Sequence, residues 1–456
     1  MSKAVQEPLE AARSDPAFDP SDPPPGALLA LGFGTTVAMW ATAYVCRLPW
    51  VMAPGAVLAV AFVLAYVVGG VWAGRRLPAV GVTLGLKVGG LASLLNLLIL
   101  GSVFKDVLGN NAAQWFLWVP GTIVLGGALS AIGYAVGRAW PAPIDDTNWS
   151  GAFARVTALA TLVLLGVGGL VTSHEAGLAV PDWPNTYTSN MFLYPLSRMT
   201  GGIYLEHAHR LFGSLVGLTT LVLAVHIHRT EARPWVKHLA TGAFVLVVCQ
   251  GMLGGMRVTG APTLSTAAED LSPNIGLAIV HGVTGQLFFG LIVALSAILA
   301  TTWRREDAGV ELTDTDAADE SRLWCTALLA LVVVQLILGA LVRHIDFEVT
   351  WHITGGVLVL MGAVATGVRV RSLHADQPEL PRWGVILIAI VGLQLVLGFV
   401  ALAVTSAKDS GGALAAHDGW VTTLHQTVGA LVLATVVLVS VWAYRFLPRA
   451  TSPSKA

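Results

Sequence analysis

Twelve long apolar stretches restrict the fold of this chain more than any other feature. A helix needs about 20 consecutive apolar residues to cross a bilayer. Runs of that kind occur near 27–46, 52–74, 79–103, 115–137, 154–173, 206–227, 238–258, 276–302, 323–343, 350–370, 383–404 and 420–444. Of 456 residues, 55% are hydrophobic and 12% are charged, with a mean hydropathy of +0.71. We therefore predict an all-α polytopic membrane protein with about twelve transmembrane helices.

The distribution of charge predicts the orientation of these helices. Most lysine and arginine residues fall in alternate connections, on the same side as both termini. Since cytoplasmic loops carry an excess of Lys and Arg, we expect both termini in the cytoplasm and the chain in the plasma membrane. A net charge of −1 gives no sign of a nucleic-acid partner. Three widely separated cysteines, without a C-x-x-C pair, argue against a disulfide framework or a thiolate metal site.

Changes in composition divide the chain into seven expected segments. They are a disordered cytoplasmic tail (1–25), a four-helix membrane module (26–140), a linker (141–153), a first four-helix half (154–302), a cytoplasmic loop (303–322), a second four-helix half (323–445) and a cytoplasmic tail (446–456). The first 150 residues contain no histidine. For this module we favour a structural or partner-docking role over a second catalytic site.

The stretch 201–217, GGIYLEHAHRLFGSLVG, holds the most unusual group of polar residues. Glu206 and His209 are three residues apart and share one helical face, which Gly213 and Gly217 continue. An ionisable group inside a membrane is costly unless it is paired or functional. We therefore predict a functional site here. An ion pair between Glu206 and Arg210, at i,i+4, is the structural alternative.

The histidine of this stretch begins an internal repeat. Three later histidines follow at intervals of 72, 71 and 73 residues, and each precedes a glycine by four positions, as His209 precedes Gly213. They are His281 with Gly285, His352 with Gly356, and His425 with Gly429. A second pattern, Gln-x-x-x-Gly, occurs in the preceding apolar runs at Gln250, Gln335 and Gln394. The repeating unit is therefore a helix pair, and the last eight helices form two pseudo-symmetric four-helix bundles.

Four histidines with one spacing favour haem ligation over isolated core histidines. Imidazole is a good axial ligand of haem iron, and a nearby glycine lets a flat macrocycle approach the helix. Zinc or copper would require a tighter mixed ligand cluster, which the sequence lacks. We expect His209 rather than His207 to be the ligand, because His207 faces roughly the opposite side of the helix. The glutamines are assigned first to helix packing.

Three arginines, Arg210, Arg257 and Arg343, fall near the outer membrane level. A guanidinium can hold a haem propionate through two hydrogen bonds. Ordinary snorkelling to the membrane surface explains their positions almost as well.

The stretch Gly177-Leu-Ala-Val-Pro-Asp-Trp-Pro184, followed by Glu206-His-Ala-His-Arg210 and the three later histidines, resembles the haem A synthase family over about residues 155–445. The resemblance implies an eight-helix core that oxidises a methyl group of haem O to a formyl group, making haem A for cytochrome oxidase. It implies Glu206 as the catalytic carboxylate, His209 and His281 around the substrate haem, and His352 and His425 as ligands of a permanent haem b. Arg210 is the candidate partner of the substrate haem.

The resemblance also suggests partners: a haem O synthase, cytochrome oxidase assembly factors and an electron acceptor. Two departures stand out. Many bacterial members of the family carry a cysteine pair in the first outer loop of the core, whereas residues 174–205 contain no cysteine. The amino-terminal four-helix module lies outside the family core.

Two other functions fit part of the pattern. A dihaem b electron-transfer protein linked to a quinol would explain every histidine, although not Glu206 or the Pro-Asp-Trp-Pro sequence. A transporter built on repeats would require helices broken at the midplane. The histidines lie near helix starts instead, so we rank this third interpretation lowest.

Overall fold

A computed structural model describes residues 22–108, 111–143, 147–260, 274–304, 315–377, 379–409 and 416–447. Within these ranges the chain is all-helical without a β-strand, and twelve helices are long and apolar enough to span a membrane. The prediction of an all-α multi-pass membrane protein is therefore confirmed. The predicted tails lie almost wholly outside the described residues, as do residues 305–314 of the predicted loop 303–322.

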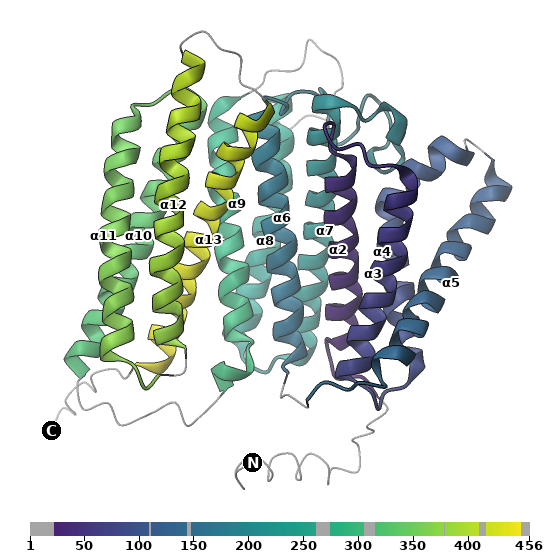
Figure 1. Cartoon of the computed structure of the whole chain (residues 1–456), viewed down its shortest axis with the longest axis horizontal. Coiled ribbons are helices and arrows are strands. Elements are labelled where there is room, and N and C mark those ends of the chain that lie inside the picture. Colours follow the sequence, from purple (N-terminus) through teal and green to yellow (C-terminus); the bar gives the residue numbers. More distant parts are fainter. Residues whose placement is uncertain are drawn as a thin grey trace, which may run out of the picture. The chain divides into compact units, whose positions relative to one another are not determined.

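The long helices follow the apolar runs (Figure 1). They are α2 (Ala27–Arg47), α3 (Gly55–Arg76), α4 (Val82–Leu108), α5 (Ala112–Gly137), α6 (Trp149–Ser173), α7 (Gly201–Thr230), α8 (Pro234–Thr259), α9 (Ile275–Ile298), α10 (Thr315–Ile345), α11 (Val349–Leu373), α12 (Leu380–Asp409) and α13 (Ala416–Phe446). Local signals set several ends. Asn274 caps α9 by accepting a hydrogen bond from Leu277 N at 3.0 Å, and Gly260 ends α8 at φ 75°.

The described helices form two compact units. Unit 1 contains residues up to 46, 53–97 and 110–149, and therefore most of α2 to α5. Its helices enclose a small polar network: Trp40 Nε1 donates to Asn96 Oδ1 at 3.0 Å, and Asn96 Nδ2 donates to the Tyr66 hydroxyl at 3.1 Å. These bonds satisfy polar groups that would be costly to bury alone. No histidine occurs in this unit.

Unit 2 contains residues 47–52, 98–109 and 150–456, and holds all four repeated histidines. Helix α8 packs between α7 and α9, while α10 to α13 are neighbours in chain order and α13 also contacts α10. Helix α9 contacts both α10 and α13. These contacts join the first four-helix half of unit 2, α6 to α9, to the second half, α10 to α13 (Figure 1). Buried aliphatic and aromatic side chains of α10 to α13 form the largest core of the second half.

Candidate functional site

The structure brings the four repeated histidines together as two pairs. His209 on α7 faces His281 on α9, with ring centroids 6.2 Å apart and ring planes at 88°. His352 on α11 faces His425 on α13, with centroids 6.3 Å apart and planes at 83°. Each half of unit 2 thus contains one histidine pair of nearly the same geometry.

The spacing of each pair suits two ligands of a single metal ion. Two imidazoles on opposite sides of one metal place their centroids about 6 Å apart, because a metal–nitrogen bond measures about 2.0–2.1 Å. No group of three or more His, Cys, Asp and Glu that could hold a metal occurs among the described residues. A haem fits a site with two protein ligands, because the macrocycle supplies the other four nitrogens.

Backbone carbonyls beside the rings are a second feature that suits haem ligation. The Nδ1 atoms of His209, His281 and His425 make no hydrogen bond of strict geometry among the described residues, but carbonyls of Leu164, Gln250 and Gln394 lie close to the same rings. A metal-binding imidazole usually donates its second ring N–H to a carbonyl of this kind. The residues present therefore fit a haem in each half.

A glycine of the preceding helix supports each histidine ring. A Cβ atom added to this glycine would lie 2.9–3.3 Å from the Cε1 atom of the ring, closer than ordinary packing allows. The four pairs are Gly168 with His209, Gly254 with His281, Gly339 with His352, and Gly398 with His425. Each ring therefore lies directly on a helix backbone, which fixes its position.

The contact is reciprocal in three of the four helix pairs. The glutamine one turn before the supporting glycine packs against the glycine one turn after the histidine, with an amide atom 3.2–3.5 Å from a Cβ placed there. The pairs are Gln250 with Gly285, Gln335 with Gly356, and Gln394 with Gly429. In each of these helix pairs, the histidine of the second helix packs on a glycine of the first, and the glutamine of the first packs on a glycine of the second.

These glutamines also contact the histidine segments. Gln335 Nε2 donates to the carbonyl of His352 at 2.8 Å and lies 3.0 Å from Nδ1 of the same ring. Gln394 Nε2 lies 3.4 Å from His425 Nε2, at the long limit of a hydrogen bond. The glutamines therefore hold His352 and His425 in position in addition to packing helices, a role that the sequence pattern did not indicate.

The helix pair that carries His209 lacks this glutamine. Leu164 occupies the position four residues before Gly168, and no side chain lies within 4 Å of a Cβ placed on Gly213 or Gly217. The face of α7 beside His209 is therefore apolar and open where the other three helix pairs hold an amide.

The carboxylate of Glu206 is buried and strongly hydrogen-bonded. It is 4% exposed, and it accepts from Arg210 Nη2 at 2.7 Å and from Val180 N at 2.8 Å. The ion pair expected at i,i+4 is therefore present. An ionised carboxylate offers about four lone pairs, so these two bonds leave acceptor sites for another group.

Arg210 fastens the segment 174–200 to α7. Its guanidinium donates to the carbonyls of Val180 at 2.8 Å and Asn185 at 3.0 Å, and also to that of Asp182. The carboxylate of Asp182 accepts in turn from the backbone amides of Tyr187 and Thr188, at 2.8 and 2.7 Å. The Pro-Asp-Trp-Pro sequence is thus a folded turn anchored by the same arginine that pairs with Glu206.

The tryptophan of this sequence reaches α8. The Trp183 indole lies directly against Gly255, the residue after the glycine that supports His281. The segment 174–200 therefore contacts α7, which carries His209, and α8, which supports His281. A Trp there needs a glycine on α8, since any Cβ would overlap the ring.

His207 belongs to the folded segment and not to the histidine pair. Its side chain is fully buried, its Nδ1 lies 3.0 Å from Thr186 Oγ1, and its ring lies 5.4 Å from that of Tyr194. His209, two residues later, points to His281 instead.

Arg257 and Arg343 lie at the same end of unit 2 as the segment 174–200. The Arg257 guanidinium contacts Gly177 and acts electrostatically on Glu206, His209 and His281. Arg343 donates to the carbonyl of Thr172. Both arginines also lie close enough to His344 to act on it electrostatically.

The remaining histidines have local roles where their side chains are described. His226 bonds to Ser150 at 2.9 Å, His374 bonds to Ser321 at 2.8 Å, and His174 stacks on Trp50. The side chain of His417 lies outside the described residues.

Residues 190–351 match the family described as cytochrome oxidase assembly protein (COX15-CtaA). The resemblance to the haem A synthase family is thereby confirmed for this segment. The match is shorter than the expected 155–445: it includes Glu206, His209 and His281, and ends one residue before His352. None of the curated proteins matches the chain.

Proposed function

We propose that this chain is a haem A synthase that oxidises a methyl group of haem O to a formyl group for cytochrome oxidase. The observation that carries the proposal is the difference between two similar histidine pairs. Among the described residues, only the first pair lies beside a buried carboxylate, and only there does leucine stand in place of the glutamine. The match to a cytochrome oxidase assembly family supports the same conclusion.

In this proposal each half of unit 2 holds one haem. His209 and His281 hold the substrate, haem O, with Arg210 and Arg257 beside it. His352 and His425 hold a permanent haem b, whose iron supplies one-electron redox chemistry when bound. The supporting glycines and the glutamines hold the ligand rings in position.

Glu206 is the proposed catalytic carboxylate. Its unused lone pairs can position a water molecule, and its negative charge can stabilise positive charge that develops as the methyl group is oxidised. Arg210 and Val180 hold this carboxylate in a single orientation. The segment 174–200 excludes bulk water above the site, because Trp183 and the Arg210-anchored turn pack onto α7 and α8.

Conversion of a methyl to a formyl group with water as the oxygen source releases four electrons and four protons. An electron acceptor is therefore a required partner, besides haem O and the lipid bilayer. We place the protein in the plasma membrane with both termini in the cytoplasm, following the charge distribution. The amino-terminal module is the proposed docking partner of a haem O synthase or an assembly factor, and no nucleic-acid partner is proposed.

The test is extraction and chromatography of pigments from a host that makes haem O. We expect haem A with the intact chain, and loss of haem A with retained haem b in Glu206→Gln. The matched control is Glu348→Gln, which removes an exposed carboxylate four residues before His352 in the second half. Haem b alone in the intact protein, with unconverted haem O in the host, would favour the dihaem electron-transfer protein instead.

A further inference from the structure

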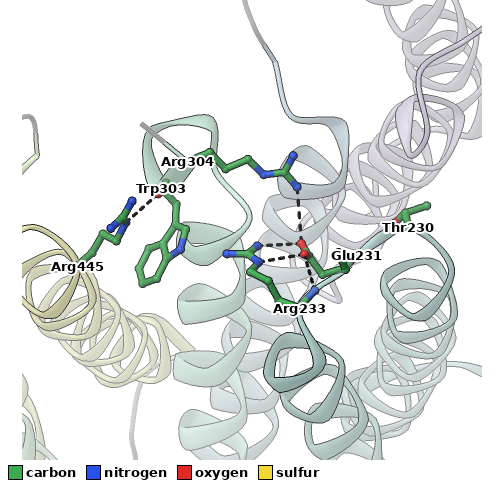
Figure 2. A pocket seen from close by; sticks show the side chains of 7 residues that line it. Thr230, Glu231, Arg233, Trp303, Arg304 and Arg445 are labelled. Carbon is green, nitrogen blue, oxygen red and sulfur yellow. Dashed lines mark hydrogen bonds and ion pairs between the residues drawn. The ribbon is translucent and has the colours of Figure 1, made fainter. Parts of the chain in front are cut away.

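An open cleft of about 450 Å³ lies where α7 ends and α8 begins, about a helix length from His209 (Figure 2). Residues of both halves of unit 2 line it: Thr230, Glu231, Ala232, Arg233, Trp303, Arg304 and Arg445. Neither the histidine pairs nor the segment 174–200 contribute to this cleft. Its chemistry therefore needs an explanation separate from the proposed haem sites.

Three arginines and one carboxylate are among the described residues that line the cleft. Arg233 donates to both oxygens of Glu231, at 2.9 and 2.8 Å, while Arg304 reaches the same carboxylate at only 3.6 Å (Figure 2). These hydrogen bonds from Arg233 lower the pKa of Glu231 to about 2, so the carboxylate is ionised at neutral pH. Glu231 is thus held mainly by Arg233, and the Arg304 guanidinium is only loosely paired with it.

Trp303 lines the cleft beside these charges, and two more tryptophans pack around it. The Arg445 guanidinium lies over the Trp303 ring at 5.6 Å, and its Nε donates to the Trp303 carbonyl at 2.8 Å. Trp235 and Trp442 lie 6.3 and 6.0 Å from Trp303, centroid to centroid. Tryptophan clusters at helix ends are typical of the level where lipid headgroups meet the hydrocarbon core.

We infer that this cleft binds the phosphate group of an anionic phospholipid. An arginine guanidinium is planar and can donate two hydrogen bonds to the oxygens of one phosphate group. The Arg304 side chain is 59% exposed, so it is open to an incoming headgroup. The cleft lies at helix ends beside tryptophan rings, where acyl chains can lie along the apolar helix surface. These features favour a lipid over a free phosphate ion. The inference does not depend on the proposed haem chemistry.

The experiment titrates the full-length purified protein in detergent with phosphatidylglycerol and measures bound lipid by native mass spectrometry. Arg304→Gln should weaken binding about fivefold, the value expected for one arginine at an anionic surface. Arg445→Lys, which retains charge but loses the planar fork, should also weaken binding. The matched control is Arg229→Gln, since Arg229 is exposed at the end of α7 but does not line the cleft. We expect less than a twofold effect there, and weak binding of zwitterionic phosphatidylcholine to all forms.

Equal losses of phosphatidylglycerol binding in Arg304→Gln and Arg229→Gln would overturn the inference. They would show that the lipid responds to positive charge anywhere on this surface and not to the cleft. Displacement of phosphatidylglycerol by millimolar inorganic phosphate would overturn it too, and would assign the cleft to a free anion. Because Arg304 is largely exposed, its replacement should not prevent folding. An unchanged thermal unfolding midpoint checks this point.

Discussion

The two halves of unit 2 hold their histidine pairs in nearly the same geometry but surround them differently. The ring separations of 6.2 and 6.3 Å differ by very little. The first pair lies under a folded segment tied down by Arg210 and beside the buried Glu206. The second pair has two glutamines in contact with its histidines, and Glu348, four residues before His352 in the chain, is exposed. A repeated scaffold can thus hold two similar groups while only one half acquires the polar residues for chemistry.

The largest expected effects come from removing one ligand in each half. His352→Ala should lose haem b from the purified protein, whereas His209→Ala should keep haem b but produce no haem A. The reason is that each histidine serves only its own pair. Absorption spectra of the purified proteins and pigment extracts measure the two outcomes. His238→Ala, which removes an exposed histidine of α8, is the control. Loss of haem b in His209→Ala would show that the two pairs do not act as separate sites.

Removal of the Arg210 side chain should destabilise the first half alone. Arg210→Met leaves Glu206 as an unpaired buried carboxylate and breaks the bonds to the carbonyls of the segment 174–200. The expected cost is about 3–5 kcal/mol in free energy of unfolding. Thermal unfolding in detergent measures it, while haem b absorption reports on the second half. Arg210→Lys should cost less, since it keeps the charge without the planar fork. A cost near zero would mean that the ion pair contributes nothing to anchoring the segment.

A methyl group under one histidine should disturb that pair only. In Gly339→Ala the new Cβ lies 2.9 Å from His352 Cε1, so the ring must shift. Overpacking of this kind costs about 1–3 kcal/mol, and we expect weaker haem b retention with an altered spectrum. Gly392→Ala, on α12, meets nothing within 4 Å and should be neutral or slightly stabilising. If both variants kept a wild-type spectrum, the close contact with Gly339 would not determine the position of the His352 ring.

The smallest expected effects come from exchanging the residues that distinguish the halves. Leu164→Gln places an amide beside the open face at Gly213, and should lower haem A formation about fivefold with haem b unchanged. Gln335→Leu removes the bond to the His352 carbonyl and should weaken haem b retention by a similar factor. Quantified haem A and haem b per chain measure the two effects. Equal changes in both pigments for both variants would contradict the proposed division of roles.

The twelve helices were predictable because each depends on one local stretch of sequence, and the histidine repeat because its interval can be counted along the chain. A bilayer sets a minimum length of apolar sequence, and that length is visible without knowing any neighbour. The folded segment around Asp182 was not predictable in the same way. Its Pro-Asp-Trp-Pro sequence identified a family, but the contacts to Arg210 and Gly255 depend on how the segment folds onto α7 and α8.

The supporting glycines were missed for a specific reason. The Gln-x-x-x-Gly pattern marks Gly254, Gly339 and Gly398, but in α6 the glutamine is replaced by Leu164, and Gly168 lies among several glycines. Each of these three glycines packs against the histidine of the next, antiparallel helix, so the pattern marks three of the four supporting glycines. Only the contact itself identifies Gly168 as the support of His209.

The sequence by itself determined the membrane-spanning helices and the i,i+4 neighbours Glu206 and Arg210, since these depend on residues close together in the chain. It also determined the spacing of the four histidines, which can be counted along the chain. The tertiary structure decided which histidines pair, which glycine supports each ring, and that charges of both halves share one cleft at Arg445. Helix packing brings together residues tens of positions apart, and one apolar helix face does not specify its neighbour, because the same hydrophobic pattern packs against many surfaces.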